Sequence, residues 1–115
     1  MPYMLLIVEP PGQRTVRSVE DGHAVYQRML DYSQTLQSKG VLLGVNSLKS
    51  AALRLRKRPG EPSMVDGPFT EAREFIGGYF LLDCQTQEQA RAYAEQCPAA
   101  EWATIEIREV GPCYV

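Results

Sequence analysis

"YMLLIV", residues 3–8, is the stretch that decides the fold of this 115-residue chain. The run is too short for a core helix and "EPPG" ends it at once, so it predicts a β-strand with apolar side chains on both faces. A second run, "YFLLDC" at residues 79–84, has the same character. A sheet built on two such strands needs cover on both of its faces.

Two capped helices are predicted around these strands. Ser18 with Asp21 resembles a capping pair at the start of the first helix, and Gly40 fits its left-handed end. Thr86 with Gln89 forms a capping box for the second. The apolar positions that share one helical face are Val25, Met29, Tyr32 and Leu36 in the first helix, and Ala90, Tyr93, Ala94 and Cys97 in the second.

Alternating or apolar patterns predict further strands at residues 41–48, 52–57, 63–65 and 103–110. We expect a helical turn at residues 70–75, ended by Gly77 and Gly78. The order of elements indicates one α+β domain over residues 1–115, a ferredoxin-like split β-α-β arrangement with an extra hairpin. Two helices would cover one face of an antiparallel sheet. A second copy of the chain would cover the other, so we expect a homodimer.

Composition and charge argue against nucleic-acid and membrane partners. The formal net charge is -2, so the chain as a whole has no attraction for nucleic acid or an anionic membrane. The basic stretch "RLRKRPGE" fits the wet face of an edge hairpin better than a nucleic-acid site. No segment resembles a secretory signal or a membrane span, so we expect a cytoplasmic protein.

Metal and cofactor motifs are not found in the sequence. Cys84, Cys97 and Cys113 are far apart with no CxxC pair, and His23 is the single histidine, so we expect reduced thiols and no metal site. "GGYF" is not followed by the helix that a dinucleotide fingerprint needs. We therefore expect no cofactor.

The stretch "DGPFTEAREFIGGYF", residues 66–80, resembles the YCII-related family and in particular its DGPF-domain branch. "YMLLIV", "KGVLL" and "CPAAEWATIEIREV" extend the resemblance over nearly the whole chain. The resemblance implies a dimeric α+β barrel, in which two ferredoxin-like sheets pack face to face. A few relatives look like small-molecule lyases or dehalogenating enzymes that use a His-Asp pair. Many DGPF members carry Gly-Glu where this chain has Val45 and Asn46, which removes a carboxylate from the presumed cleft.

Asp66 and His23 are the candidate catalytic pair. Asp66 has two readings: it caps its own turn, or it presents a carboxylate to a small polar ligand. His23 is either a surface or interface residue or a base at neutral pH. The residues that we expect to bind a ligand around the pair are Tyr26, Asn46, Gly67, Pro68, Phe69 and Arg73.

Two functions from different classes stay open at this point. The first is a small-molecule enzyme of acid-base type, a lyase or hydrolase, in which His23 and Asp66 react in one cleft. The second is a ligand-binding or regulatory dimer without chemistry, and the missing carboxylate at Asn46 favours it slightly. A shared cavity for His23 and Asp66 would favour the first.

Overall fold

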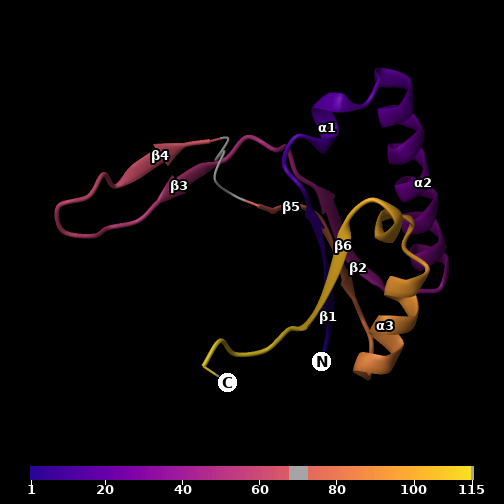
Figure 1. Cartoon of the computed structure of the whole chain (residues 1–115). Coiled ribbons are helices and arrows are strands. Elements are labelled where there is room, and N and C mark those ends of the chain that lie inside the picture. The colour runs from indigo at the N-terminus through magenta and orange to yellow at the C-terminus, as the bar shows by residue number, and fades with distance from the viewer. Residues whose placement is uncertain (68–72, 115) are drawn as a thin grey trace.

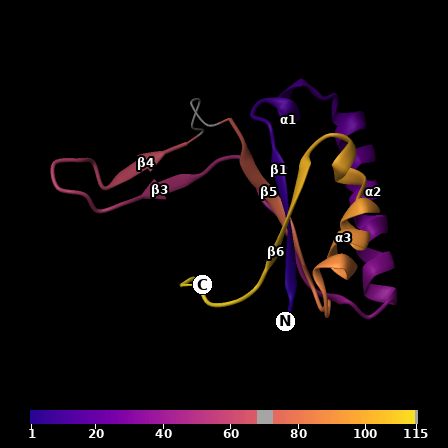
Figure 2. The same ribbon diagram turned by 60° about the horizontal axis from the view of Figure 1, so that its bottom comes forward.

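A four-stranded antiparallel sheet is the centre of the fold in the computed structural model, which describes residues 1–67 and 73–114. Its strand order is β2-β5-β1-β6. The strands are β1 (Tyr3–Glu9), β2 (Leu42–Ser47), β5 (Phe75–Leu82) and β6 (Thr104–Glu109). The long helix α2 (Val19–Ser38) and the shorter α3 (Gln87–Glu95) cover one face of this sheet (Figures 1 and 2). The α+β prediction with two helices on one face is confirmed.

Alternate residues of β1 make the core against the helices. Leu5 lies opposite Phe80 of β5 and Ile107 of β6, and both Leu5 and Phe80 are buried. Tyr32 of α2 meets Phe80 edge to face, with the ring centroids 5.1 Å apart, and its hydroxyl donates to the carbonyl of Tyr93 at 2.6 Å. This contact joins the two helices above the sheet, so the apolar faces predicted for both helices are correct.

The predicted caps determine where the helices begin and end. Ser18 Oγ accepts the backbone N–H of Asp21 at 3.0 Å, and Gly40 has the left-handed φ of 73° just after α2. Thr86 Oγ1 accepts the N–H of Gln89 at 3.2 Å at the start of α3. Two short helices were not predicted: α1 (Gln13–Val16) and the 3-10 helix η1 (Pro98–Glu101).

The Gly77–Gly78 pair lies inside strand β5, so the prediction that these glycines end a helical turn is wrong. Residues 70–72 of that predicted turn are outside the described part of the chain, and Phe75 is the first residue of the strand. A Cβ on Gly77 would lie 1.5 Å from Oε2 of Glu9, and a Cβ on Gly78 would lie 2.8 Å from the carbonyl oxygen of Asn46. The two glycines therefore permit close approach rather than a turn.

A two-stranded hairpin of β3 (Leu53–Leu55) and β4 (Met64–Asp66) leaves the sheet on the side opposite to the helices (Figures 1 and 2). Its apolar side chains are exposed, Leu55 by 59%. The sheet face on the same side carries alternate apolar residues of β1, which are only half-buried: Met4, Leu6 and Val8. Closure of a barrel over this face needs a second chain, so it stays a prediction.

None of the described helices, α2 included, combines the length and the apolar character needed to cross a bilayer.

Candidate functional site

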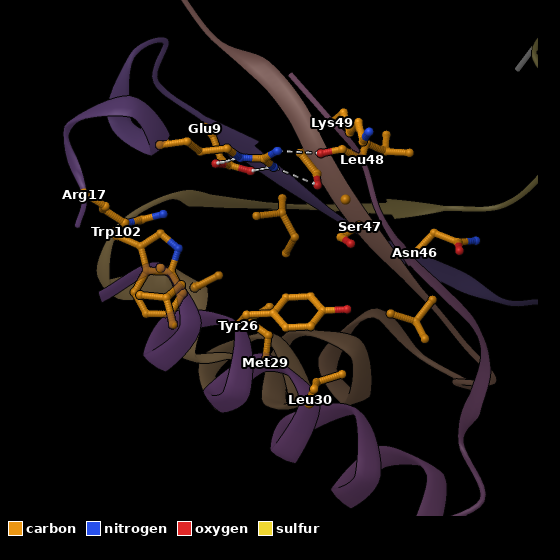
Figure 3. Close-up of a pocket in the computed structure, with 18 of the residues that line it drawn as sticks. Glu9, Arg17, Tyr26, Met29, Leu30, Asn46, Ser47, Leu48, Lys49 and Trp102 are labelled. Carbon is orange, nitrogen blue, oxygen red and sulfur yellow. Dashed lines mark hydrogen bonds and ion pairs between the residues drawn. The ribbon is translucent and has the colours of Figure 1, made fainter. Parts of the chain in front are cut away.

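A cavity of about 880 Å³ lies between α2 and the sheet. Figure 3 shows the side chains of Tyr26, Met29 and Leu30 reaching from α2 toward the strands. Ile7, Val45 and Phe80 of the sheet form the apolar side opposite them. Polar and charged residues border the cavity as well: Glu9, Arg14, Arg17, Ser18, His23, Ser33, Asn46, Ser47, Lys49 and Tyr79. Small-molecule sites have this size and this mixture of apolar walls with a few polar groups.

One end of the cavity is formed by a bound pair of opposite charges, Glu9 and Arg14. Nε and Nη2 of Arg14 donate to the two carboxylate oxygens of Glu9 at 3.0 and 2.6 Å, and Glu9 is only 5% exposed. The same guanidinium donates to the carbonyl oxygens of Leu48 at 2.6 Å and of Gly77 at 3.2 Å (Figure 3). Arg14 thus ties α1 to the ends of three strands, which gives the pair a structural task.

Trp102 contacts two arginine side chains at another edge of the cavity. The guanidinium carbon of Arg17 is 5.7 Å from the centre of the indole ring, and that of Arg28 is 5.4 Å away. Arg28 also forms an ion pair with Glu101, and this hydrogen bond holds the pKa of the Glu101 carboxyl below its ordinary value. Arg17, which borders the cavity, forms no ion pair with any residue that the structure describes.

His23 and Tyr26 both border the cavity from α2. His23 is exposed, and Tyr26 is 54% exposed with its ring directed toward the sheet (Figure 3). Of the predicted site residues these two are brought together by the helical spacing, since residues three apart share a face. His23 is therefore in reach of solvent and of a molecule in the cavity.

Asn46 lies in the wall of the cavity through its strand, but its side chain points away from the cavity (Figure 3). Its Nδ2 donates to the hydroxyl of Tyr79 at 2.9 Å, and the two residues are directly opposite each other in β2 and β5. Neighbouring residues of a strand face opposite sides, so Val45 faces the cavity and Asn46 the open face. The amide group of Asn46 is thus bound to Tyr79, and a role of Asn46 in holding a ligand stays a prediction.

The DGPF stretch lies outside the cavity as far as the structure describes it. The backbone of Asp66 ends β4, and the N–H of Gly67 donates to the carbonyl of Ala52 at 2.6 Å within the hairpin. Arg73 is exposed just before β5. Pro68, Phe69 and the side chain of Asp66 are outside the described part of the chain. Pairing of His23 with Asp66 therefore stays a prediction.

Among the cavity residues that the sequence analysis missed are Arg17, Lys49 and Trp102. Arg17 directly precedes the Ser18 cap, so its place at the start of α2 could have been found. Lys49 follows β2 and could have been found as a polar strand end. Trp102 comes to the cavity through η1, which no local pattern placed against α2.

Comparisons with known proteins agree with this architecture. The YCII-related domain matches residues 1–113. An uncharacterized protein of Rhizobium meliloti (strain 1021) is 36% identical over 61 residues, a segment that spans 51% of this chain and 49% of that protein. The chain thus matches about half the length of this curated relative.

A solved structure with a similar fold is 5-chloro-2-hydroxyhydroquinone dehydrochlorinase (TftG) from Burkholderia phenoliruptrix AC1100, in complex with 2,5-dihydroxybenzoquinone. The TM-score is 0.57, with 14% sequence identity, and the match covers 96% of this chain and 94% of that one. At this identity the likeness concerns the fold. Membership of the DGPF branch stays a prediction.

Proposed function

Because this chain belongs to the YCII-related family, we propose that it binds a small organic molecule between α2 and the sheet and catalyses an acid-base reaction on it, of lyase or hydrolase type. The observation that carries the proposal is the cavity of about 880 Å³ with the one histidine of the chain at its border. Imidazole is the side chain best suited to exchange protons near neutral pH.

In this proposal His23 accepts a proton from the bound molecule and the Tyr26 hydroxyl holds a polar atom of it. Both residues border the cavity and lie three positions apart on α2. The apolar residues on the sheet side of the cavity exclude water from the body of the ligand. This exclusion strengthens the polar contacts that the ligand makes at the border of the cavity. We propose Asp66 as the carboxylate that orients His23.

The likeness to TftG supports the lyase type. The name of that protein describes the dehydrochlorination of 5-chloro-2-hydroxyhydroquinone, and its structure is a complex with 2,5-dihydroxybenzoquinone. A proton acceptor is one of the groups that such an elimination uses. A histidine at the border of a helix–sheet cavity in a similar fold supports a reaction of this type.

The alternative is a ligand-binding dimer without catalysis, and one observation favours it. Glu9 is the one carboxylate among the described residues that border the cavity, and both of its oxygens are bound to Arg14. Among these residues His23 thus has no free carboxylate beside it to stabilise a positive charge. The alternative predicts binding without any reaction.

A two-step experiment separates the two functions. Thermal shift against a metabolite set identifies ligands, since a ligand at about a hundred times its dissociation constant stabilises by roughly 2.7 kcal/mol. Each ligand is then incubated with the protein in D₂O, and NMR follows loss of C–H signals and appearance of products. The enzyme function predicts exchange or turnover that His23→Gln abolishes while binding persists. Ligands that bind and never react would support the alternative.

We also propose that the protein works as a homodimer. The open face of the sheet and the hairpin carry apolar side chains that the chain itself leaves exposed, including Ile76, Leu53 and Leu55. An isolated two-stranded hairpin has little stability in water. A second copy packed against this face would bury both surfaces at once.

A further inference from the structure

The charged residues around the cavity do not balance, and this imbalance indicates which molecules it takes. We infer that its ligand is an organic anion, a carboxylate or similar oxyanion on an apolar ring-sized body, whose charged group binds Arg17. The inference rests on the proposed binding function and adds the chemical class of the ligand. It does not depend on whether a reaction follows binding.

Four charged residues border the cavity in the described part of the chain: Glu9, Arg14, Arg17 and Lys49. Glu9 and Arg14 neutralise each other through two hydrogen bonds, with the carboxylate almost fully buried. Arg17 and Lys49 remain, and no carboxylate of the described residues is paired with either. A concave apolar surface with two uncompensated cations attracts anions and concentrates the field inside it.

Arg17 is the cation best placed to contact a ligand. It is half-buried, and its guanidinium lies against the indole of Trp102 at one end of the residues drawn in Figure 3. Arg28 also contacts this ring, but it holds Glu101, whereas Arg17 has no acceptor among the described residues. A flat guanidinium held on an aromatic ring can present its N–H groups to both oxygens of a carboxylate.

Lys49 acts at longer range. It is exposed and follows β2, and Figure 3 places it on the far side of the cavity from Arg17. A solvated ammonium there raises the positive potential without fixing an orientation. We therefore assign orientation to Arg17 and attraction to Lys49.

The apolar side chains that line the cavity indicate the chemical character of the uncharged part of the ligand. Ile7, Met29 and Phe80 offer apolar surface, and the ring of Tyr26 lies across the space between helix and sheet (Figure 3). These side chains suit the apolar body of an aromatic or alicyclic ring.

The test uses matched pairs of compounds, each an aromatic or alicyclic carboxylic acid and its primary amide, with the full-length protein. The two members have nearly the same size and differ in charge. Ligand-observed NMR measures each Kd at low and at high salt. We expect acids to bind roughly tenfold more tightly than their amides, a difference that salt reduces. Equal affinity of acids and amides would overturn the anion class and leave the binding function intact, whereas no binding of either would overturn both.

Variants identify the cation. Arg17→Gln should raise the Kd of the acid roughly tenfold and leave that of the amide unchanged. Lys49→Gln should raise the Kd of the acid by a smaller factor and reduce the dependence of that Kd on salt. Arg91→Gln removes an exposed arginine of α3 that does not border the cavity, so it should change neither the Kd of the acid nor that of the amide. If Arg17→Gln weakened acid and amide alike, or neither, the assignment of Arg17 would be wrong.

Discussion

The carboxylate of Glu9 and the guanidinium of Arg14 face each other in a two-point contact, with N–O distances of 3.0 and 2.6 Å. Because the other N–H groups of Arg14 reach the carbonyls of Leu48 and Gly77, one side chain satisfies acceptors from three strand ends. Glu9 is the one buried charged residue in the described part of the chain. The pair therefore holds the end of the cavity in place.

Removal of Arg14 should cost more stability than any exposed ion pair of this chain. Arg14→Gln leaves Glu9 buried without its partner, a change that costs about 3 kcal/mol at a largely buried pair. Urea denaturation of the wild type and the variant measures the difference in free energy of unfolding. Arg56→Gln is the matched control, since its pair with Glu61 is exposed, and should cost less than about 1 kcal/mol. Equal losses in the two variants would contradict the structural role of Arg14.

Gly77→Ala should be strongly destabilising, while Gly22→Ala should stabilise. A Cβ at Gly77 meets Oε2 of Glu9 at 1.5 Å and Nη2 of Arg14 at 2.6 Å, so the pair must be displaced. A Cβ at Gly22, inside α2, meets nothing within 4 Å, and alanine there gains roughly 0.5–1 kcal/mol. Thermal unfolding of both variants tests the contrast. A Gly77→Ala protein as stable as the wild type would show that Glu9 does not occupy this position.

Cys97 should make stability fall at alkaline pH. Burial raises the pKa of its thiol to about 11 from an ordinary value of 9.0. Below pH 9 the thiol is protonated in both states. Between pH 9 and 11 the Cys97 thiol ionises in the unfolded chain but stays protonated in the folded one. The stability that the protonated thiol contributes to the folded state is therefore lost as the pH rises. Its full size is about 2–3 kcal/mol.

The comparison of wild type with Cys97→Ala at pH 8 and pH 10 isolates this contribution. Burial also raises the pKa of Tyr32 in both proteins, and the charge of Cys97 adds a smaller contribution that is present in the wild type alone. The wild type should lose about 1 kcal/mol more than the variant between the two pH values. Equal losses would mean that the thiol ionises as readily in the folded protein as in the unfolded one.

A contact between His23 and Asp66 should be visible in the imidazole spectra. A carboxylate that accepts a hydrogen bond from one ring nitrogen fixes the tautomer of a neutral histidine. Long-range ¹H–¹⁵N spectra at a pH where the ring is neutral should then show one tautomer in the wild type and a mixture in Asp66→Asn. Glu61→Gln, in the same hairpin, should leave the spectrum unchanged. Identical spectra for all three proteins would remove the pair and leave His23 to act alone.

The open face of the sheet should carry the dimer contact. Ile76→Arg places a charge on that face and should give monomers in sedimentation equilibrium at micromolar concentration, where we expect the wild type to be a dimer. Val16→Arg changes a residue of α1 that is more exposed than Ile76, and it should remain dimeric. A monomeric wild type would contradict the dimer outright.

The parts of the fold that follow from local chemistry could be predicted, and the parts that depend on distant contacts could not. Ser18 and Thr86 cap helices because their side chains meet N–H groups three residues ahead, and the sequence contains both partners. The prediction for Gly77 was wrong because a glycine is needed there to leave space for the carboxylate of Glu9, which lies on a different strand. His23 and Tyr26 were placed together by helical spacing, whereas Arg17 meets Trp102 only after α2 and η1 have packed.

The two buried residues of α2, Tyr32 and Leu36, both lie in its second half. The part of α2 that precedes Tyr32 borders the cavity and is held by half-buried and surface contacts, among them Val25, Met29 and the ion pair of Arg28 with Glu101. Because this part of α2 has few buried apolar contacts, its local opening costs little free energy, whereas Tyr32 and Leu36 hold the rest of the helix on the sheet. We therefore expect amide hydrogen exchange to be faster between residues 19 and 30 than around residue 36, and an entering ligand to widen the cavity by moving the first part of α2.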